Sequence, residues 1–335
     1  MTSLGQTAQI PIVDMALART GPSRNLAEKL AWTCAATGFF VLTGHGIPDA
    51  VVTDAQEAAR AFFGLEEWQK RVVVRTPPVF NRGWIPPQTE SLGSTLGTDA
   101  PADLKESFTL GPPEVPDTEY YTRPDAFPHF ARNVWPGEPA VLRPALTRYF
   151  RAVEVLATEL MRLFAIGLDL PEHWFDDKIN RQCGSLRALF YPPQPDGAAE
   201  GQLRAGAHTD YGCITILKTE DAPGGLQVAA PDGRWIDVPV VPGGFVVNLG
   251  DLMRHWTNDR WASTLHRVVN PPPDARLSRG RLSLAFFHQP NYDAVIDCVP
   301  TCVDAAHPAA YAPTTSGAHR LRKLFKANAF EGAPA

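Results

Sequence analysis

Apolar residues recur every three to four positions in two stretches of the N-terminal region, which predicts two helices. The first helix begins at Ser23, a residue type that caps helix N-termini well, and ends at Gly38. The second begins near Asp49 and continues through the apolar pair at 62–63. Compact apolar runs precede each helix, and we expect them to form short strands.

A longer helical pattern follows, and the chain then changes to a period typical of strands. Residues 139–168 carry apolar side chains at helical spacing, which predicts a core helix. From there to about residue 296 we expect strands, separated by turns rich in proline and glycine. The predicted strands cover 185–191, 207–218, 225–229, 235–237, 244–249, 263–270 and 281–288.

This order of elements predicts the fold class. Many short strands joined by such turns are typical of an antiparallel double-sheet jelly roll, and the helical region can pack against its outer face. We therefore expect an α+β protein with a mainly β core. The jelly-roll core is expected over 181–300, after an N-terminal region, 1–180, that packs on it rather than forming an independent domain.

The C-terminal part, 301–335, is predicted to hold one helix and a tail. The helix is expected from Ser316 to about residue 326. Its cationic side chains are interpreted as a solvated face rather than a binding patch; they are Arg320, Arg322, Lys323 and Lys326.

Residues 76–125 are dense in proline, glycine, serine and threonine, and a strand-like run at 105–110 is embedded in them. Long irregular segments of this kind in compact domains often form lids or walls of binding sites. We therefore expect Arg82, Trp84 and Phe108 to contact a substrate, with Arg82 as an anchor for an anionic group. Ordinary packing explains Trp84 and Phe108 equally well.

Composition and charge exclude several classes of function. The 335 residues are 44% hydrophobic, enough for a large core, and a net charge of −5 gives no signature of nucleic-acid binding. Five scattered cysteines and the absence of an apolar leader predict reduced thiols in a cytoplasmic protein. Because no run of about 18 apolar residues exists, we expect no membrane span.

The strongest chemical signal is a histidine and an aspartate two positions apart. In an extended strand, His208 and Asp210 project from the same side, and Thr209 points the other way. A third ligand, His266, lies on a distant predicted strand. Two imidazoles and one carboxylate leave three coordination positions of a metal open, which suits non-haem Fe(II) and oxygen chemistry.

A second pair strengthens this interpretation, because a histidine near an aspartate is by itself common. Arg281 and Ser283 share one face of a predicted strand downstream of His266. A guanidinium beside a hydroxyl is suited to holding a carboxylate. The order H-x-D, H, R-x-S is specific, although His₂-carboxylate sets also bind Zn²⁺ in hydrolases.

Taken with other motifs, these residues resemble a known family. The chain has I-P-x-x-D at 10–14, G-F-F-V-L-x-G-H-G-I at 38–47, Tyr-Pro at 191–192, H-T-D-Y-G at 208–212, G-G-L-Q-V at 224–228 and N-x-G-D at 248–251. This series resembles the isopenicillin N synthase-like branch of the Fe(II)/2-oxoglutarate-dependent oxygenases, which includes plant flavonoid and gibberellin oxidases and ethylene-forming enzymes. The resemblance covers almost the whole chain.

The resemblance implies roles for individual residues. His208, Asp210 and His266 match the iron ligands of the family, and Arg281 and Ser283 match the pair that binds the distal carboxylate of 2-oxoglutarate. Tyr191 resembles a tyrosine that assists cosubstrate binding in several relatives. Tyr211 and Phe287 are expected in the wall of the substrate pocket.

The resemblance also implies the reaction. We expect Fe(II), 2-oxoglutarate and O2 to oxidise a C–H bond of a small organic metabolite, with release of succinate and CO2. Hydroxylation, desaturation and ring closure all stay open, and natural-product biosynthesis is the expected setting. The sequence does not indicate the oligomeric state.

Three alternatives remain at this point. Isopenicillin N synthase uses the same R-x-S to hold its substrate's carboxylate and needs no 2-oxoglutarate. A metal-binding jelly roll without catalysis is a second alternative, although the intact set of five residues argues against it. A zinc hydrolase is the third, but it would need a general base near the metal and leaves Arg281 without a role.

Overall fold

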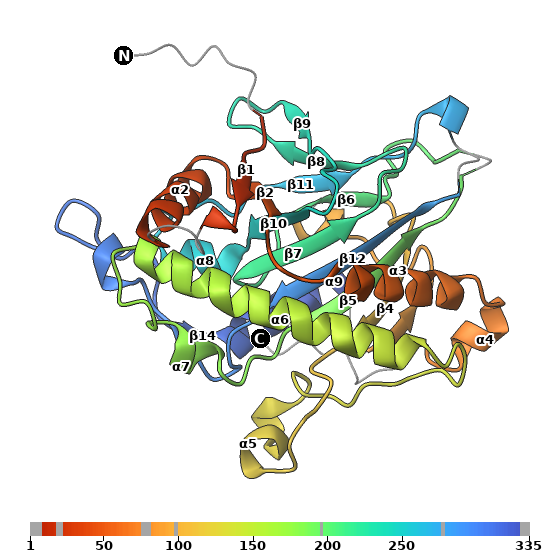
Figure 1. Cartoon of the computed structure of the whole chain (residues 1–335), viewed down its shortest axis with the longest axis horizontal. Coiled ribbons are helices and arrows are strands. Elements are labelled where there is room, and N and C mark those ends of the chain that lie inside the picture. Colours follow the sequence, from red (N-terminus) through yellow and green to blue (C-terminus); the bar gives the residue numbers. More distant parts are fainter. Residues whose placement is uncertain are drawn as a thin grey trace.

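The computed structural model describes residues 9–17, 23–74, 82–96, 100–194, 197–275 and 279–328, with side chains up to 323. Figure 1 shows strands at the centre and long helices across one face of them. The longer helices are α2 (Ser23–Ala36), α3 (Asp49–Phe63), α6 (Leu142–Gly167) and α9 (Ser316–Asn328). Short helices and turns are α4 (Glu67–Arg71), η1 (Gly93–Leu96), α5 (Glu119–Thr122), η2 (Pro124–Ala126), α7 (Asp176–Ile179), α8 (Asp251–Trp256), η3 (Pro273–Ala275) and η4 (Pro300–Cys302).

The strands form two facing sheets and a small extra ribbon. In spatial order, the large sheet contains β1 (Ile12–Asp14), β2 (Phe39–Thr43), β10 (Phe245–Leu249), β7 (Ile214–Thr219), β12 (Arg281–His288), β5 (Ser185–Tyr191), β4 (Glu106–Leu110) and β3 (Gly83–Ile85). The small sheet contains β6 (Ala205–His208), β11 (His266–Val268), β8 (Leu226–Ala229) and β9 (Trp235–Asp237). The ribbon pairs β13 (Val295–Ile296) with β14 (Thr314–Thr315).

The chain passes back and forth between the two sheets from β5 to β12. This alternation, with antiparallel pairing throughout, makes the double-stranded β-helix, or jelly roll, that the turn pattern predicted. The fold class is therefore confirmed as α+β with a mainly β core. A cavity lies between the sheets, because side chains of both line it.

Helix α6 lies along the outer face of the large sheet and packs against both α2 and α3 (Figure 1). Its buried residues recur at three and four positions, as the sequence pattern predicted, and form one apolar face. Phe150 on this face contacts Phe286 of β12 edge to face, with ring centroids 5.0 Å apart. The helices thus support the sheet from outside and leave its inner face free for the cavity.

The N-terminal region contributes more than helices. Strands β1 to β4 all lie in the large sheet, and β2 pairs directly with β10 while β4 pairs with β5. The boundary at 180/181 remains a prediction. Of the helices in the described ranges, none combines the length and apolar character that crossing a bilayer requires.

Two predictions of local structure were wrong. The strand expected over 207–218 is split: β6 ends at His208, the chain turns, and β7 begins at Ile214. The strand-only interpretation up to 296 also missed α8, which follows Gly250. A Cβ on Gly250 would lie 2.3 Å from the carbonyl oxygen of Gly212, so the turn after β6 packs directly against the start of α8.

Candidate active site

The two histidines of the predicted metal site face each other across a pair of strands. His266 of β11 is the direct antiparallel partner of His208 of β6. Side chains at paired positions project to the same face of a sheet. The two imidazole centroids are therefore only 4.3 Å apart, although 58 positions separate the residues in the sequence.

Asp210 reaches the same point from the turn that follows β6, not from the strand itself. Its Oδ1 lies 3.9 Å from Nε2 of His208 and 3.9 Å from Nε2 of His266. One ligand atom from each residue lies within 4.8 Å of the others, and all three residues are buried. The structure thus brings the three predicted ligands together.

The hydrogen bonds of these residues test whether they suit a metal ion. Nδ1 of His208 lies 2.7 Å from the carbonyl oxygen of Gly206, and Nδ1 of His266 lies 3.0 Å from that of Thr264. A carbonyl oxygen can only accept, so each Nδ1 carries the proton and each Nε2 presents a lone pair toward Asp210. Two neutral nitrogen donors and one carboxylate oxygen fit a divalent iron ion.

The electrostatics of the buried group agree with this assignment. Burial, followed by the neighbouring His266, lowers the pKa of His208, so that its imidazole is neutral. Burial alone would raise the pKa of Asp210. The two histidines and two hydrogen bonds outweigh that effect and hold this pKa below its ordinary value.

Two side chains that the sequence analysis did not single out orient Asp210. Asn248 Nδ2 donates to its Oδ2 over 2.7 Å, and Thr215 Oγ1 donates to the same oxygen over 2.5 Å. The backbone N–H of Asp251 also donates to the carbonyl oxygen of Asp210. The N-x-G-D motif therefore fixes the carboxylate from outside. The motif was visible in the sequence, but the sequence did not indicate that it bonds Asp210, which lies in the turn after β6.

The second predicted pair lies in the same cavity. Arg281 and Ser283 lie two positions apart on β12, and both line the cavity. Tyr191, the cross-strand partner of Arg281, lines it too. Nη1 of Arg281 donates to the carbonyl oxygens of Ala222 and Gly224, each over 2.7 Å. These bonds hold the guanidinium in place and leave its other donors for a ligand.

A third hydroxyl lines this end of the cavity, and a second guanidinium packs beside Tyr191 without lining the cavity itself. Thr219 Oγ1 lies 3.0 Å from Ser283 Oγ. Arg204 is fully buried, its Nη1 donates to the carbonyl oxygen of Pro223 over 2.6 Å, and its guanidinium carbon lies 5.8 Å from the ring centroid of Tyr191. Burial and the nearby Arg281 lower the pKa of Arg204 to about 10. The result is a positively charged end that suits a carboxylate.

Glycine makes this approach of the two arginines possible. Gly224 has φ +74°, and a Cβ there would lie 2.7 Å from Nη1 of Arg204 and 2.7 Å from the carbonyl oxygen of Val269. The G-G-L-Q-V motif is thus explained by the chain's close contact with Arg204 and by the Gly224 carbonyl that accepts from Arg281.

Of the side chains expected in the substrate wall, Tyr211 and Phe287 line the cavity. The other three do not. Arg82 is buried away from it and donates to the carbonyl oxygens of Ala131 and His129. Trp84 donates to Glu106 over 2.6 Å, and Phe108 packs in the main core. The structure therefore places these three residues outside the lining of the cavity, where they pack and bond elsewhere.

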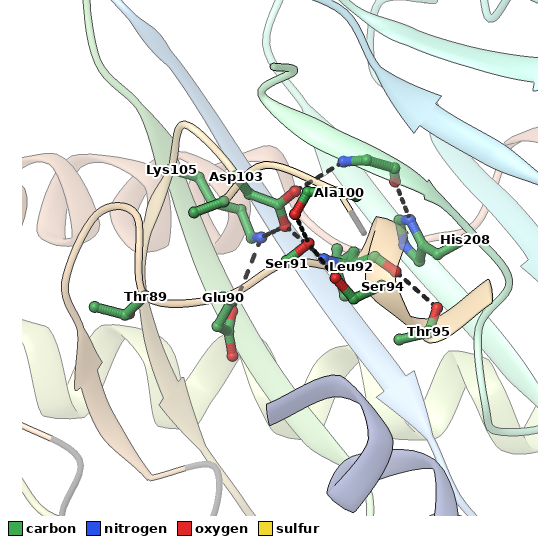
Figure 2. Close-up of polar contacts among 12 residues, drawn as sticks. Thr89, Glu90, Ser91, Leu92, Ser94, Thr95, Ala100, Asp103, Lys105 and His208 are labelled. Carbon is green, nitrogen blue, oxygen red and sulfur yellow. Dashed lines mark hydrogen bonds and ion pairs between the residues drawn. The ribbon is translucent and has the colours of Figure 1, made fainter. Parts of the chain in front are cut away.

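The same segment still reaches the cavity, through residues that the sequence analysis did not name. Leu92 and Lys105 line it, and η1 packs against both β6 and α9. Figure 2 shows the hydrogen bonds that connect this segment to the metal site. Asp103 accepts from Lys105 and from the backbone N–H of Gly206, whose carbonyl oxygen accepts from His208. The segment thus forms one wall of the site.

Helix α9 also differs from its predicted role as a solvated face. Arg320 is only 5% exposed and lines the cavity, and Lys323 pairs with Asp251 over 2.7 Å. Arg322 is exposed as expected. Ser316, Gly317 and Arg320 share one side of the helix because they are spaced by three and four residues, and all three are buried. The small residues at 316 and 317 were the sequence signal for a packed face.

Comparisons with known proteins identify the family. Residues 181–290 match the 2OG-Fe(II) oxygenase superfamily, and residues 10–138 match the N-terminal region described as that of a non-haem dioxygenase in morphine synthesis. The chain is 37% identical over 297 residues to the 2-oxoglutarate-Fe(II) type oxidoreductase hxnY of Emericella nidulans, covering 87% of this chain and 81% of that one.

Two further relatives extend the comparison. Validamycin A dioxygenase of Streptomyces hygroscopicus subsp. limoneus is 32% identical over 295 residues, which are 86% of this chain and 79% of that protein. Neurospora crassa T7H, solved in complex with alpha-KG and thymine, superimposes with a TM-score of 0.81 at 30% identity, over 94% of this chain and 96% of that one.

The likeness extends over most of the length of each protein, so the enzyme class and its cofactors follow with the family. Fe(II) is its metal, and 2-oxoglutarate and O2 are its cosubstrates. The resemblance drawn from the motifs is confirmed, and neither the isopenicillin N synthase-type oxidase without 2-oxoglutarate nor the non-catalytic jelly roll is favoured. The chain belongs to the 2OG-Fe(II) oxygenase superfamily and is a 2-oxoglutarate-dependent dioxygenase.

Proposed function

We propose that His208, Asp210 and His266 hold the Fe(II) ion, and that Arg281, Ser283 and Tyr191 bind the distal carboxylate of 2-oxoglutarate. One observation carries this assignment: the three ligand atoms converge in the same cavity that Arg281 and Ser283 line. When bound, Fe(II) and 2-oxoglutarate together supply the activation of O2 that oxidises a C–H bond, with release of succinate and CO2.

The spacing along β7 links the two sites. Thr215 bonds the metal ligand Asp210, and Thr219 bonds Ser283 of the cosubstrate site. Four residues of strand span about 13 Å. Arg281 and Ser283 would therefore hold one carboxylate of the diacid toward one end of β7, with Asp210 held toward the other.

We assign the remaining side of the cavity to a small organic substrate. Tyr211 and Phe287 provide apolar rings there, and both are half-buried and line the cavity. Orientation against these rings decides which C–H bond is oxidised, and exclusion of water protects the reaction. The match to Validamycin A dioxygenase supports a role in natural-product biosynthesis.

Cysteine chemistry supports a proposal about the cellular setting. All five cysteines are free, and Cys34, Cys183 and Cys213 are buried. Burial raises the pKa of each of these three thiols and keeps them unreactive. We infer from this that the protein works in a reducing, cytoplasmic compartment.

Titration of 2-oxoglutarate into the anaerobic Fe(II) protein tests the assignment. We expect a weak visible metal-to-ligand charge-transfer band, and substrate-stimulated succinate release once O2 is admitted. R281Q should raise the 2-oxoglutarate dissociation constant about 10- to 100-fold, because it removes a charge-assisted pair. The matched control is R279Q, an exposed arginine two positions earlier. Absence of the band in wild type, or an unchanged constant in R281Q, would refute the assignment.

A further inference from the structure

The end of the cavity that lies beyond the metal ligands has its own guanidinium. Arg320 Nη1 lies 3.2 Å from the carbonyl oxygen of Cys183, two residues before β5 begins. Ser185, at the start of β5, pairs with Phe287 at the far end of β12 from Arg281. Six strand residues separate these ends, about 20 Å. Arg281 and Arg320 thus lie toward opposite ends of β12, and the metal ligand Asp210, held by Thr215 opposite Phe287, lies toward the Arg320 end.

Besides Arg281, three cations line the cavity, and two of them are neutralised. Lys105 pairs with Asp103 and lies 3.8 Å from Glu90, and Arg187 pairs with Glu90 over 3.1 Å. Arg320 has no such partner. In the described part of the chain its hydrogen bonds go to the carbonyl oxygen of Cys183 and to Nδ1 of His129. The positive charge of Arg320 is therefore in surplus.

His129, the side chain that accepts from Arg320, does not balance its positive charge. It is 1% exposed, and an arginine can only donate, so its Nδ1 accepts from Arg320 and the ring is neutral. Burial, followed by Arg320 and Arg82, lowers the pKa of His129 to about 3, in agreement with this. A buried guanidinium without an anion costs free energy, which an anionic ligand in the cavity would recover.

Other polar groups at this end also lack partners. The hydroxyl of Tyr211 and Oε1 of Gln289 are buried without a hydrogen-bond partner in the described structure, and both residues line the cavity. A Cβ on Gly212 would lie 2.5 Å from Nε2 of Gln289, so Gln289 packs against the turn that carries Tyr211. Around them are the apolar side chains of Leu92 and Phe287. Arg320 thus brings an uncompensated charge to the cavity wall, and Tyr211 and Gln289 bring unpaired polar atoms.

We propose that Arg320 binds a carboxylate of the substrate, so that the enzyme oxidises a small monocarboxylic acid with an apolar body. A single surplus charge matches a monoanion, and the planar guanidinium matches a carboxylate. The apolar part of the acid lies between Phe287 and Leu92, and its reacting carbon lies on the metal side of Arg320. This inference rests on the proposed function and adds the substrate class to it.

Paired acids and amides test the proposal. The probes are aryl acetates, benzene and pyridine carboxylates, alkanoates and N-acyl amino acids, each with its primary amide, added to the full-length Fe(II) protein with 2-oxoglutarate and O2. We expect one or more acids to stimulate succinate release and their amides to fail. Stimulation by amides equal to that by acids overturns the proposal. A panel in which no acid stimulates release overturns it as well.

Variants of α9 separate the role of Arg320 from folding. R320Q should raise the Michaelis constant of the stimulating acid about 10- to 100-fold, and R320K should recover part of this loss. Loss of the exposed charge in R322Q should leave the constant unchanged. The anaerobic 2-oxoglutarate band in R320Q reports whether the site is still folded. If R320Q shows the band and its Michaelis constant for the acid is unchanged, the substrate assignment alone is overturned. If the wild-type protein shows no band, the proposed function is refuted.

Discussion

Asn248 donates a 2.7 Å hydrogen bond to Oδ2 of Asp210, the carboxylate oxygen that does not face the two imidazoles. Thr215 donates to the same oxygen. Oδ1 is thereby left toward the histidine pair, and the carboxylate has one orientation. The bond joins the central part of the large sheet to the turn after β6, so the metal site depends on how the two sheets are packed.

Removal of this bond should weaken metal binding. We expect N248A to raise the Fe(II) concentration needed for half-maximal activity about 10- to 100-fold, since groups that orient a metal ligand typically have effects of that size. Fe(II)-dependent succinate release measures the change. Q227A removes an amide that bonds Asp237 and Arg267 in the small sheet, and it should behave as wild type. An unchanged iron dependence in N248A would show that Thr215 alone orients Asp210.

The buried pair of Lys105 and Asp103 should contribute strongly to stability. Both side chains are almost fully buried, and Asp103 also accepts from the backbone of Gly206, beside His208 (Figure 2). D103N keeps an acceptor for Gly206 but leaves the ammonium of Lys105 with Glu90 at 3.8 Å. We expect a loss of about 3 to 5 kcal/mol, as for other broken buried pairs, measured by urea unfolding.

The double variant D103N/K105M supplies the control for this prediction. It removes both charges, so its stability should exceed that of D103N alone, and the thermodynamic cycle should give a coupling energy of at least about 1 kcal/mol. Additive losses within about 0.5 kcal/mol would mean that the ion pair itself contributes little.

Local sequence patterns predicted the strands of this protein better than they predicted which strands pair. The expected strands at 185–191, 235–237 and 281–288 coincide with β5, β9 and β12, because alternating apolar residues and flanking turns are local signals. The register that places His266 opposite His208 is not local. Only the family motifs indicated that these two residues would meet.

The errors have physical causes of the same kind. Asp210 shares a face with His208 in a regular strand, but here the chain leaves β6 at His208, and the turn delivers Asp210 to the same place. On α9, charge composition suggested solvent exposure. The burial of Arg320 depends on contacts with the distant residues His129 and Cys183, which no helical pattern reveals.

Protonation of buried histidines should make the fold sensitive to acid. His288 is fully buried in β12, and burial lowers its pKa to about 4 from an ordinary value of 6.5. Below pH 6.5 the unfolded chain takes up a proton that the folded chain does not. The contribution of this residue to stability is therefore largely present above pH 6.5 and is lost as the pH drops toward 4, by about 2 kcal/mol between pH 7.5 and 5.

Urea unfolding at pH 7.5 and 5.0 measures this effect. Neither H288F nor H288Q can ionise, so both should lose about 2 kcal/mol less than wild type between these pH values, even if they differ in stability at pH 7.5. An acid-induced loss as large in both variants as in wild type would assign the sensitivity to other groups, such as His319, whose pKa burial also lowers to about 4.

Trp84 should matter for stability and not for the substrate. Its indole N–H donates to Glu106 over 2.6 Å, and the ammonium of Lys70 pairs with the same carboxylate over 2.8 Å. The three side chains thus form one buried network outside the cavity. W84F removes the donor and leaves an acceptor less satisfied, which should cost about 1 to 3 kcal/mol in urea unfolding. W68F, at a tryptophan that is 69% exposed, should change stability by less than about 0.5 kcal/mol. The Michaelis constant of the substrate should be the same in both variants and wild type. A raised constant in W84F with unchanged stability would return this residue to the substrate wall.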